Sequence, residues 1–186
     1  MKILVANRGE IARRIIRTAH RLGHTTVAVY SDPDRGMPHV RDATSAVWIG
    51  PADLTSSYLS VERLLAAAAE AGADAVHPGY GFLSESAGFA RAVVGAGLAW
   101  IGPNPDAIEA MGSKIEARRI AVDAGVPLIP GFDADQADER LRSAADDIGF
   151  PVLIKASAGG GGKGIRVVAG PTEFDDALQA SRQEAL

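Results

Sequence analysis

The chain has 186 residues, of which 47% are hydrophobic and 23% charged, a composition typical of a globular protein with one or two domains. Its net charge of −4 argues against an extended nucleic-acid-binding surface, which needs excess basic residues to neutralise phosphates. Because cysteine is absent, disulfides and thiolate–metal sites are excluded. The apolar run at residues 3–6 is too short for a signal-peptide core or a membrane span, so we expect a cytoplasmic protein.

Short β-rich runs alternate with amphipathic helical patterns up to residue 101. Strands are predicted at residues 3–6, 25–30, 46–49, 75–77 and 99–101, and helices at residues 10–22, 61–71 and 85–96. Such alternation builds a parallel sheet with helices on both faces, so we predict an α/β, doubly wound, Rossmann-like domain. Ligands of such domains bind beyond the carboxyl ends of the strands.

After the last of these strands the pattern changes. Asn104 is predicted to cap a helix that ends at Gly112. Ser113 and Glu116 form the pattern of a capping box for another helix, which runs to about residue 124. The predicted division is an N-terminal domain at 1–112, a helical connector at 113–127 and a smaller unit at 128–186.

The smaller unit is predicted to contain two strands and two helices. The helices are expected near residues 134–148 and from Thr172 to the end, and the strands at residues 152–155 and 165–168. Two strands and two helices bury only a marginal core. We therefore expect the chain to stop before the partner elements of this unit.

The segment between these two strands carries the strongest chemical signal. The first strand ends in Lys155, and the loop after it contains Gly159, Gly160, Gly161, Gly162, Lys163 and Gly164. Residues without Cβ let backbone N–H groups close over phosphate oxygens, and the two lysines supply positive charge. A β-branched run follows, which predicts a hairpin rather than the helix of a P-loop. We interpret the hairpin as a lid over a nucleotide triphosphate; a glycine-rich hairpin without a ligand is the alternative.

Lys114 is a second candidate for phosphate binding. If Ser113 caps the helix, Lys114 lies in its first turn, where the helix dipole disfavours a cation by roughly 0.3–1 kcal/mol. An anion bound at this turn would reverse that effect. The alternative is an exposed lysine that tolerates the small penalty.

Residues 77–85 read HPGYGFLSE and connect a predicted strand to a predicted helix. Gly79 and Gly81 permit backbone turns that leave Tyr80 presented between them. A tight turn with a packed aromatic ring is the alternative. His77 is interpreted as a hydrogen-bonded residue at a strand end rather than a base, and no spacing of metal ligands is found.

The first strand is followed by the sequence NRGE at residues 7–10. It lacks the G-x-G-x-x-G fingerprint of dinucleotide binding, which disfavours a nicotinamide-dependent dehydrogenase. On the helix that follows, Arg14, Arg17 and Arg21 form one stripe of like charge. The stripe indicates either a solvated face or a surface for a partner that bears carboxylates.

Four strings together closely resemble the biotin carboxylase subunit or domain of biotin-dependent carboxylases. They are residues 6–12 (ANRGEIA), 77–85 (HPGYGFLSE), 101–103 (IGP) with 111–114 (MGSK), and 154–164 (IKASAGGGGKG). The resemblance extends over the whole chain. It implies an ATP-grasp enzyme in which ATP activates bicarbonate to carboxyphosphate and the released CO₂ carboxylates biotin on a carrier domain. This is the first half-reaction of acyl-CoA carboxylation.

The resemblance also implies roles for individual residues. Lys114 and Lys155 match lysines that contact ATP phosphates, and the glycine loop with Lys163 matches the ATP-grasp lid. Tyr80 matches a residue near the biotin pocket. The helix with the arginine stripe matches the homodimer interface. The implied partners are a second copy, a biotin carboxyl carrier domain and a carboxyltransferase subunit, with neither nucleic acid nor membrane.

Biotin carboxylases are longer than this chain. By resemblance, the Mg²⁺ carboxylates, the bicarbonate-binding arginine and the catalytic base are expected beyond Leu186, so no catalytic residue and no metal ligand is assigned within the chain. We expect the isolated chain to be catalytically incomplete, with only part of the ATP-grasp lid subdomain. The alternatives are a non-catalytic binding or dimerisation module, another ATP-grasp ligase, and a nucleotide-dependent oxidoreductase.

Overall fold

The structure is a computed structural model that describes residues 1–155 and 165–184. The chain divides into two compact units, Met1–Glu109 and Ala110–Leu186. The division into three parts predicted from the sequence stays a prediction.

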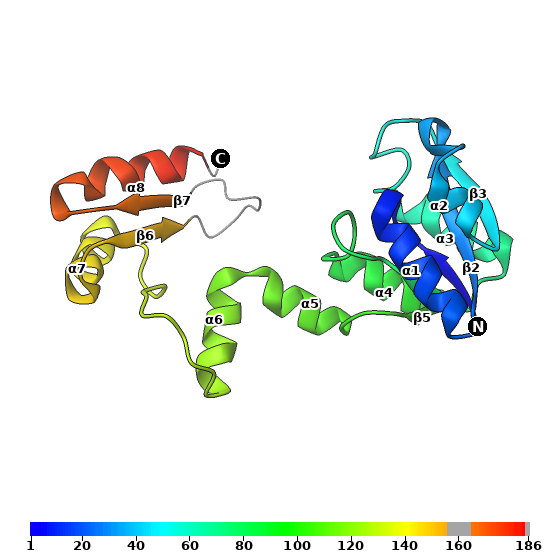
Figure 1. The fold of residues 1–186 in the computed structure, drawn as a ribbon. Helices are drawn as coiled ribbons and strands as arrows, with labels where there is room; N and C mark the ends of the chain where they lie inside the picture. Colours follow the sequence, from blue (N-terminus) through cyan, green and yellow to red (C-terminus); the bar gives the residue numbers. More distant parts are fainter. Residues whose placement is uncertain (156–164, 185–186) are drawn as a thin grey trace. The chain divides into compact units, whose positions relative to one another are not determined.

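The first unit is built on a five-stranded parallel sheet with the strand order β3-β2-β1-β4-β5 (Figure 1). The strands are β1 (Lys2–Val5), β2 (Thr25–Ser31), β3 (Ser45–Gly50), β4 (Ala75–His77) and β5 (Ala99–Trp100). The chain starts in the middle of the sheet, runs outward to β3 and then crosses back to β4. The position between β1 and β4 is therefore the topological switch point, where α/β sheets bind ligands.

Successive side chains of each strand point to opposite faces of the sheet. Because both faces carry apolar side chains, helices cover both of them. Leu4 and Val27 belong to the larger core, which also contains Leu64 and Phe89 of the helices α3 (Val61–Ala71) and α4 (Ala87–Gly95). Val5 and Ala28 pack instead with Ala12 and Ile16 of α1 (Gly9–Arg21). The predicted α/β doubly wound fold is confirmed.

The observed helices of this unit differ from the predicted ones in two respects. The helix expected from residue 85 begins at Ala87, because the Ser86 hydroxyl accepts the N–H of Phe89 at 3.1 Å and caps it. A 3₁₀ turn, η1 (Asp32–Asp34), and a short helix, α2 (Pro38–Asp42), were not predicted. Elements of three to five residues are too short to show helical periodicity.

The remaining helices and strands follow the predicted order, except that a 3₁₀ turn precedes the last helix, which begins at Phe174 and not at Thr172. They are α5 (Pro105–Gly112), α6 (Lys114–Asp123), α7 (Asp138–Ile148), β6 (Val152–Lys155), β7 (Ile165–Val168), η2 (Pro171–Glu173) and α8 (Phe174–Gln183). The predicted caps are confirmed: Asn104 accepts the N–H of Ala107 at 2.7 Å, and Ser113 accepts the N–H of Glu116 at 3.4 Å.

The core of the second unit lies between the hairpin β6–β7 and the helices α7 and α8. It contains Ala145, Val168, Phe174 and Leu178. The helix α7 begins at Asp138, four residues later than predicted, and Ala137 is the residue directly before it. Within residues 1–155 and 165–184, no helix is both long and apolar enough to cross a membrane.

Candidate functional site

The loops that follow β1 and β4 meet at the switch point of the parallel sheet. The N–H of Ala6 donates to the carbonyl of His77 at 2.9 Å, so the two strands stay paired up to their carboxyl ends. A cavity of about 320 Å³ lies between residues 7–11, which include the first turn of α1, and residues 80–82 of the loop after β4. The sheet therefore builds a concave site where its topology predicts one.

Tyr80 projects from a loop whose backbone conformation requires glycine on either side of it. Gly79 and Gly81 both have φ of +70°, and a Cβ on Gly79 would lie 2.8 Å from Cγ2 of Ile11. The Tyr80 side chain is 56% exposed, and its hydroxyl donates to a carboxylate oxygen of Glu10. The prediction that two glycines present Tyr80 is confirmed, whereas its contact with biotin stays a prediction.

Electrostatics at this edge favour a neutral phenol and a neutral imidazole. The hydrogen bond to Glu10 raises the pKa of Tyr80. Burial lowers the pKa of His77, and its Nδ1 accepts the N–H of Gly79 at 3.0 Å. His77 is thus a hydrogen-bonded residue at a strand end, as predicted from the sequence, with one ring nitrogen already used by the loop.

Beside the cavity lies a polar cluster, the Asp34 cluster, made of the buried residues Ser31, Asp34 and Tyr58 and of the partly exposed Arg8. Asp34 is 6% exposed and accepts hydrogen bonds from Tyr58 at 2.8 Å, from Ser31 at 3.1 Å and from Arg8 at 3.4 Å. Burial by itself raises the pKa of Asp34, but these three bonds and the charge of Arg8 together lower it below the usual value. Burial also raises the pKa of Tyr58, so its hydroxyl stays a donor.

Arg8 also connects this cluster to the loop that presents Tyr80. Its guanidinium lies 5.5 Å from the ring centroid of Tyr58 and 5.6 Å from that of Phe82. The two rings stack with centroids 5.2 Å apart. Sequence reasoning did not single out Asp34 or Tyr58, because neither belongs to a recognisable motif.

In the second unit, the candidate site is the hairpin β6–β7. Its strands are antiparallel, with Lys155 opposite Ile165 and Leu153 opposite Val167. These four residues share one face of the hairpin, and the exposed fractions of Leu153, Ile165 and Val167 are 47%, 45% and 70%. An open apolar face that ends in an exposed lysine suits a nucleotide, whose base is apolar and whose phosphates are anionic.

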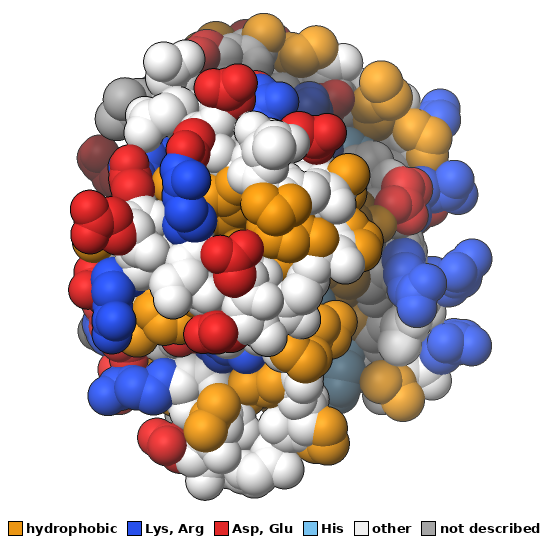
Figure 2. Space-filling model, turned by 90° about the vertical axis from the view of Figure 1, so that its left-hand side faces the viewer, with side chains coloured by type: hydrophobic (Ala, Val, Ile, Leu, Met, Phe, Trp, Pro, Cys, Tyr) orange, Lys and Arg blue, Asp and Glu red, His pale blue; other side chains and the backbone are white. Residues whose placement is uncertain are grey.

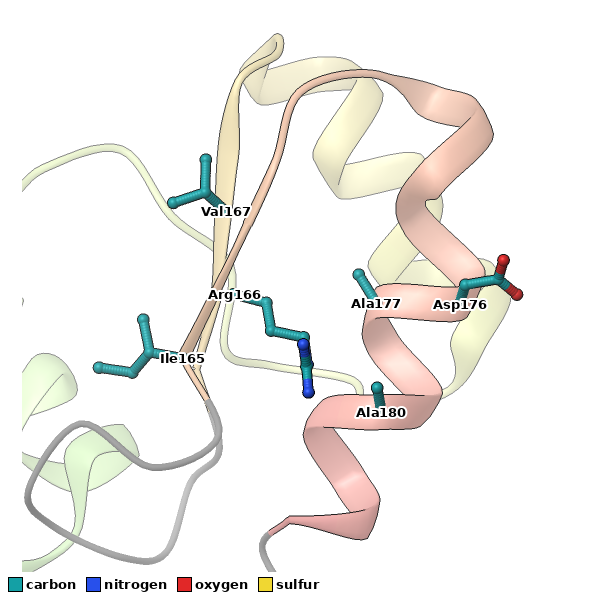
Figure 3. A pocket seen from close by; sticks show the side chains of 6 residues that line it. All are labelled: Ile165, Arg166, Val167, Asp176, Ala177 and Ala180. Atoms are coloured by element: carbon teal, nitrogen blue, oxygen red, sulfur yellow. The ribbon is translucent and has the colours of Figure 1, made fainter.

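The opposite face of the hairpin packs on α8. Figure 3 shows Arg166 pointing toward Ala177 and Ala180, while Ile165 and Val167 point the other way. These residues and Asp176 line a cavity of about 530 Å³, and the Arg166 guanidinium pairs with Glu184. Arg166 therefore serves the contact between strand and helix, and among residues 1–155 and 165–184 nothing covers the apolar face with Lys155.

The other predicted phosphate-binding residues can be placed only in part. Lys114 is the first residue of α6, directly after the capping Ser113, as predicted. The loop residues Gly159, Gly160, Gly161, Gly162, Lys163 and Gly164 lie outside the described residues. Within the described part of the chain, no group of three or more His, Asp or Glu side chains could hold a metal ion.

Arg14, Arg17 and Arg21 are all exposed on α1. Across the described ranges of the chain, none of the three forms an ion pair, whereas the neighbouring Arg13 pairs with Asp42 at 2.6 Å. In Figure 2, acidic and basic side chains are interspersed with apolar ones on the surface nearest the viewer, and several basic side chains gather at the right-hand edge.

Two family profiles match the chain. "Biotin carboxylase, N-terminal domain" matches residues 1–108, and "Carbamoyl-phosphate synthase L chain, ATP binding domain" matches residues 113–186. Among curated proteins, the α subunit of mitochondrial methylcrotonoyl-CoA carboxylase from Oryza sativa subsp. japonica is 55% identical over 185 residues, which are 99% of this chain and 25% of that protein. Biotin carboxylase 2 of Bacillus subtilis is 49% identical, over 99% of this chain and 42% of that protein.

Solved structures agree. A biotin carboxylase–β,γ-ATP complex from Campylobacter jejuni has a TM-score of 0.92 and 40% identity, covering 99% of this chain and 42% of that one. The biotin carboxylase domain dimer of the Hydrogenobacter thermophilus 2-oxoglutarate carboxylase, in complex with MgADP, ADP and bicarbonate, has a TM-score of 0.89 and 45% identity, with coverages of 99% and 41%. The chain thus spans a quarter to about two-fifths of these relatives. The similarity suggested by the four strings is confirmed.

Proposed function

Because the chain belongs to the biotin carboxylase family, we propose that it supplies the N-terminal domain and the first part of the ATP-binding domain of an enzyme that carboxylates biotin with ATP and bicarbonate. The family profile matched at residues 1–108 is the observation that carries this proposal. The position of Lys155 at the end of the open apolar face of β6–β7 supports it. The reaction would be the first step in the carboxylation of an acyl-CoA or a related acid.

In this proposal, Lys155 and Lys114 bind the phosphates of ATP. Phosphoryl transfer needs positive charge that stabilises the oxygens of the transferred group, and little covalent chemistry from the protein. Leu153, Ile165 and Val167 would cover the apolar part of the nucleotide, since their side chains lie on the face that Lys155 shares. The glycine loop, with Lys163, would close over the triphosphate. Within the described residues, no group of three or more His, Asp or Glu side chains could hold Mg²⁺, so its ligands are expected elsewhere in the enzyme.

Biotin and the partner proteins belong to the same proposal. Tyr80 would lie beside biotin, at the switch point of the sheet. The exposed stripe of Arg14, Arg17 and Arg21 would face a second copy of the chain, and a biotin carboxyl carrier domain and a carboxyltransferase would complete the complex. The cytoplasmic location stays a prediction; several relatives carry mitochondrial or chloroplastic names.

The phosphate assignment is tested by replacing lysine with glutamine, which removes the charge and keeps most of the length. The test uses an enzyme in which this chain replaces the matching part of Bacillus subtilis biotin carboxylase 2. We expect Lys155→Gln and Lys114→Gln each to lower kcat/KM for ATP at least about tenfold, roughly 1.4 kcal/mol, in biotin-dependent ATP hydrolysis.

Lys2→Gln is the matched control. Lys2 belongs to the first unit, where its ammonium donates to the carbonyl of Ala71 at 2.7 Å, and the proposal gives it no part in binding ATP. If Lys155→Gln and Lys114→Gln both kept the ATP kinetics of the Lys2→Gln control, the proposal would be wrong. An unmutated enzyme without biotin-dependent turnover would favour the non-catalytic module.

A further inference from the structure

The loop from Pro78 to Phe82 is fixed to the first βα turn at both of its ends. Gly79, Gly81 and Phe82 have φ of +70°, +70° and +44°, and Phe82 is the one non-glycine residue with positive φ among the described residues. A positive φ is unfavourable for a phenylalanine, so contacts from elsewhere must hold this conformation. Those contacts come from Asn7 and Arg8.

Asn7 holds the first part of the loop. It is fully buried, and its Nδ2 donates to the carbonyl of Pro78 at 2.8 Å and to that of Tyr80 at 2.9 Å. Its Oδ1 accepts the N–H of Arg8 at 2.9 Å, which fixes the orientation of the amide. A buried carbonyl without a hydrogen-bond partner is costly. The side chain of Asn7 therefore fixes where the carbonyls of Pro78 and Tyr80 lie. The absence of a side chain at Gly79 lets Asn7 approach so closely.

Arg8 holds the second part. Its guanidinium lies over the stacked rings of Tyr58 and Phe82, and its Nη1 pairs with the buried Asp34. Asp34 in turn accepts from Tyr58, so the guanidinium is oriented from two sides. A planar guanidinium can stack and pair at the same time, which an ammonium cannot do equally well. Arg8, the residue directly before α1, therefore holds the ring of Phe82 in place.

We propose that Asn7 and Arg8 are positioning residues that hold the loop from Pro78 to Phe82 in its strained conformation, and thereby set the place of Tyr80. The hydroxyl of Tyr80 completes the arrangement by donating to Glu10, two residues after Arg8. The consequence for biotin rests on the proposed function. If Tyr80 contacts biotin, Asn7 and Arg8 control biotin binding without contacting biotin themselves. ATP binding by the second unit should then not depend on Asn7 or Arg8.

The first experiment needs no activity. In ¹⁵N-labelled chain, the ring nitrogens of His77 and the amide of Gly79 report the hydrogen bond between Nδ1 and that amide. We expect Asn7→Ala and Arg8→Met to shift these resonances and the Tyr80 amide. Arg8→Lys, which keeps the charge beside Asp34 but not the planar stacking, should give a smaller shift. Arg13→Met, in the helix α1 that begins directly after Arg8, is the matched control, because Arg13 pairs with Asp42 instead.

The second experiment measures kinetics in the same chimeric enzyme. Arg8→Met should raise KM for biotin by about fivefold or more and leave KM for ATP within about twofold, a split that general destabilisation would not produce. If Asn7→Ala does not fold, the two Arg8 variants decide. Loop resonances that match those of Arg13→Met in every folded variant would overturn the positioning role. Shifted resonances with an unchanged KM for biotin would support positioning and overturn the assignment of Tyr80 to biotin.

Discussion

The two glycines beside Tyr80 form a matched pair for testing how the switch-point loop is built. Both have φ of +70°, but their surroundings differ. A Cβ on Gly79 would meet Ile11 at 2.8 Å and Asn7 at 2.9 Å, whereas a Cβ on Gly81 would find no atom of the described residues within 4 Å. Gly79→Ala and Gly81→Ala therefore place an alanine in the same unfavourable backbone conformation. Only at residue 79 would the new methyl group also clash with neighbouring atoms of the described residues.

The magnitudes follow from these two contributions. An alanine in the left-handed region costs about 1–2 kcal/mol relative to glycine. Overpacking a well-packed position adds about 1–3 kcal/mol. We expect Gly81→Ala to lower the free energy of unfolding by about 1–2 kcal/mol, and Gly79→Ala by about 2–5 kcal/mol.

The assay uses the two tryptophans of the chain, Trp48 and Trp100, which both lie in the first unit. Urea unfolding followed by their fluorescence therefore reports the first unit without a contribution from the second. The difference between the two variants, rather than either value alone, measures the contact of the loop with Asn7 and Ile11. Equal destabilisation by the two substitutions would refute the close packing described for Gly79.

Two further predictions use the same assay. Burial lowers the pKa of His39 from 6.5, so as pH falls below about 6.5 the imidazole is protonated in the unfolded chain before it is protonated in the folded one, and the first unit should lose stability. His39→Gln should reduce the dependence of the unfolding free energy on pH between about pH 7 and 5.5. An unchanged slope in that range would contradict the prediction. The low pKa of Asp34 has the same sign but acts only as pH falls through and below about 3.8. Phe89→Ala removes a side chain that is 1% exposed and packs edge-on against Trp100, and should cost about 3–5 kcal/mol. The control Val94→Ala, on the same helix but 53% exposed, should change stability by at most about 0.5 kcal/mol, and similar losses from both would refute the burial argument.

Much of the fold could be read from the sequence because its signals are local. The five strands of the first unit are apolar runs bounded by turns, and α1 and α3 show helical spacing, so their type and order were predicted correctly. The caps Asn104 and Ser113 act on amides three residues away, and their prediction was also correct. The short helix α2 was missed, because five residues do not show a period.

The candidate site divides in the same way. Gly79 and Gly81 turn the backbone around Tyr80 by their own conformational freedom, which the sequence alone indicates. Lys155 was predicted at the end of an apolar strand, but only the pairing of β6 with β7 shows that Leu153, Ile165 and Val167 share its face. The partners of the Asp34 cluster carry no such signal. Arg8, Asp34 and Tyr58 are separated by 24 residues or more, and each could equally have been a surface residue.

The sequence by itself thus determined the five strands and the longer helices, the family and the presentation of Tyr80, since each depends on residues close together in the chain or on motifs kept in order. Only the tertiary structure decided that Asn7 reaches carbonyls 71 and 73 residues away and that Arg8 stacks on Phe82. The physical reason is the strand order. By placing β4 beside β1, the sheet brings their following loops into contact, and buried polar groups there must find partners in each other.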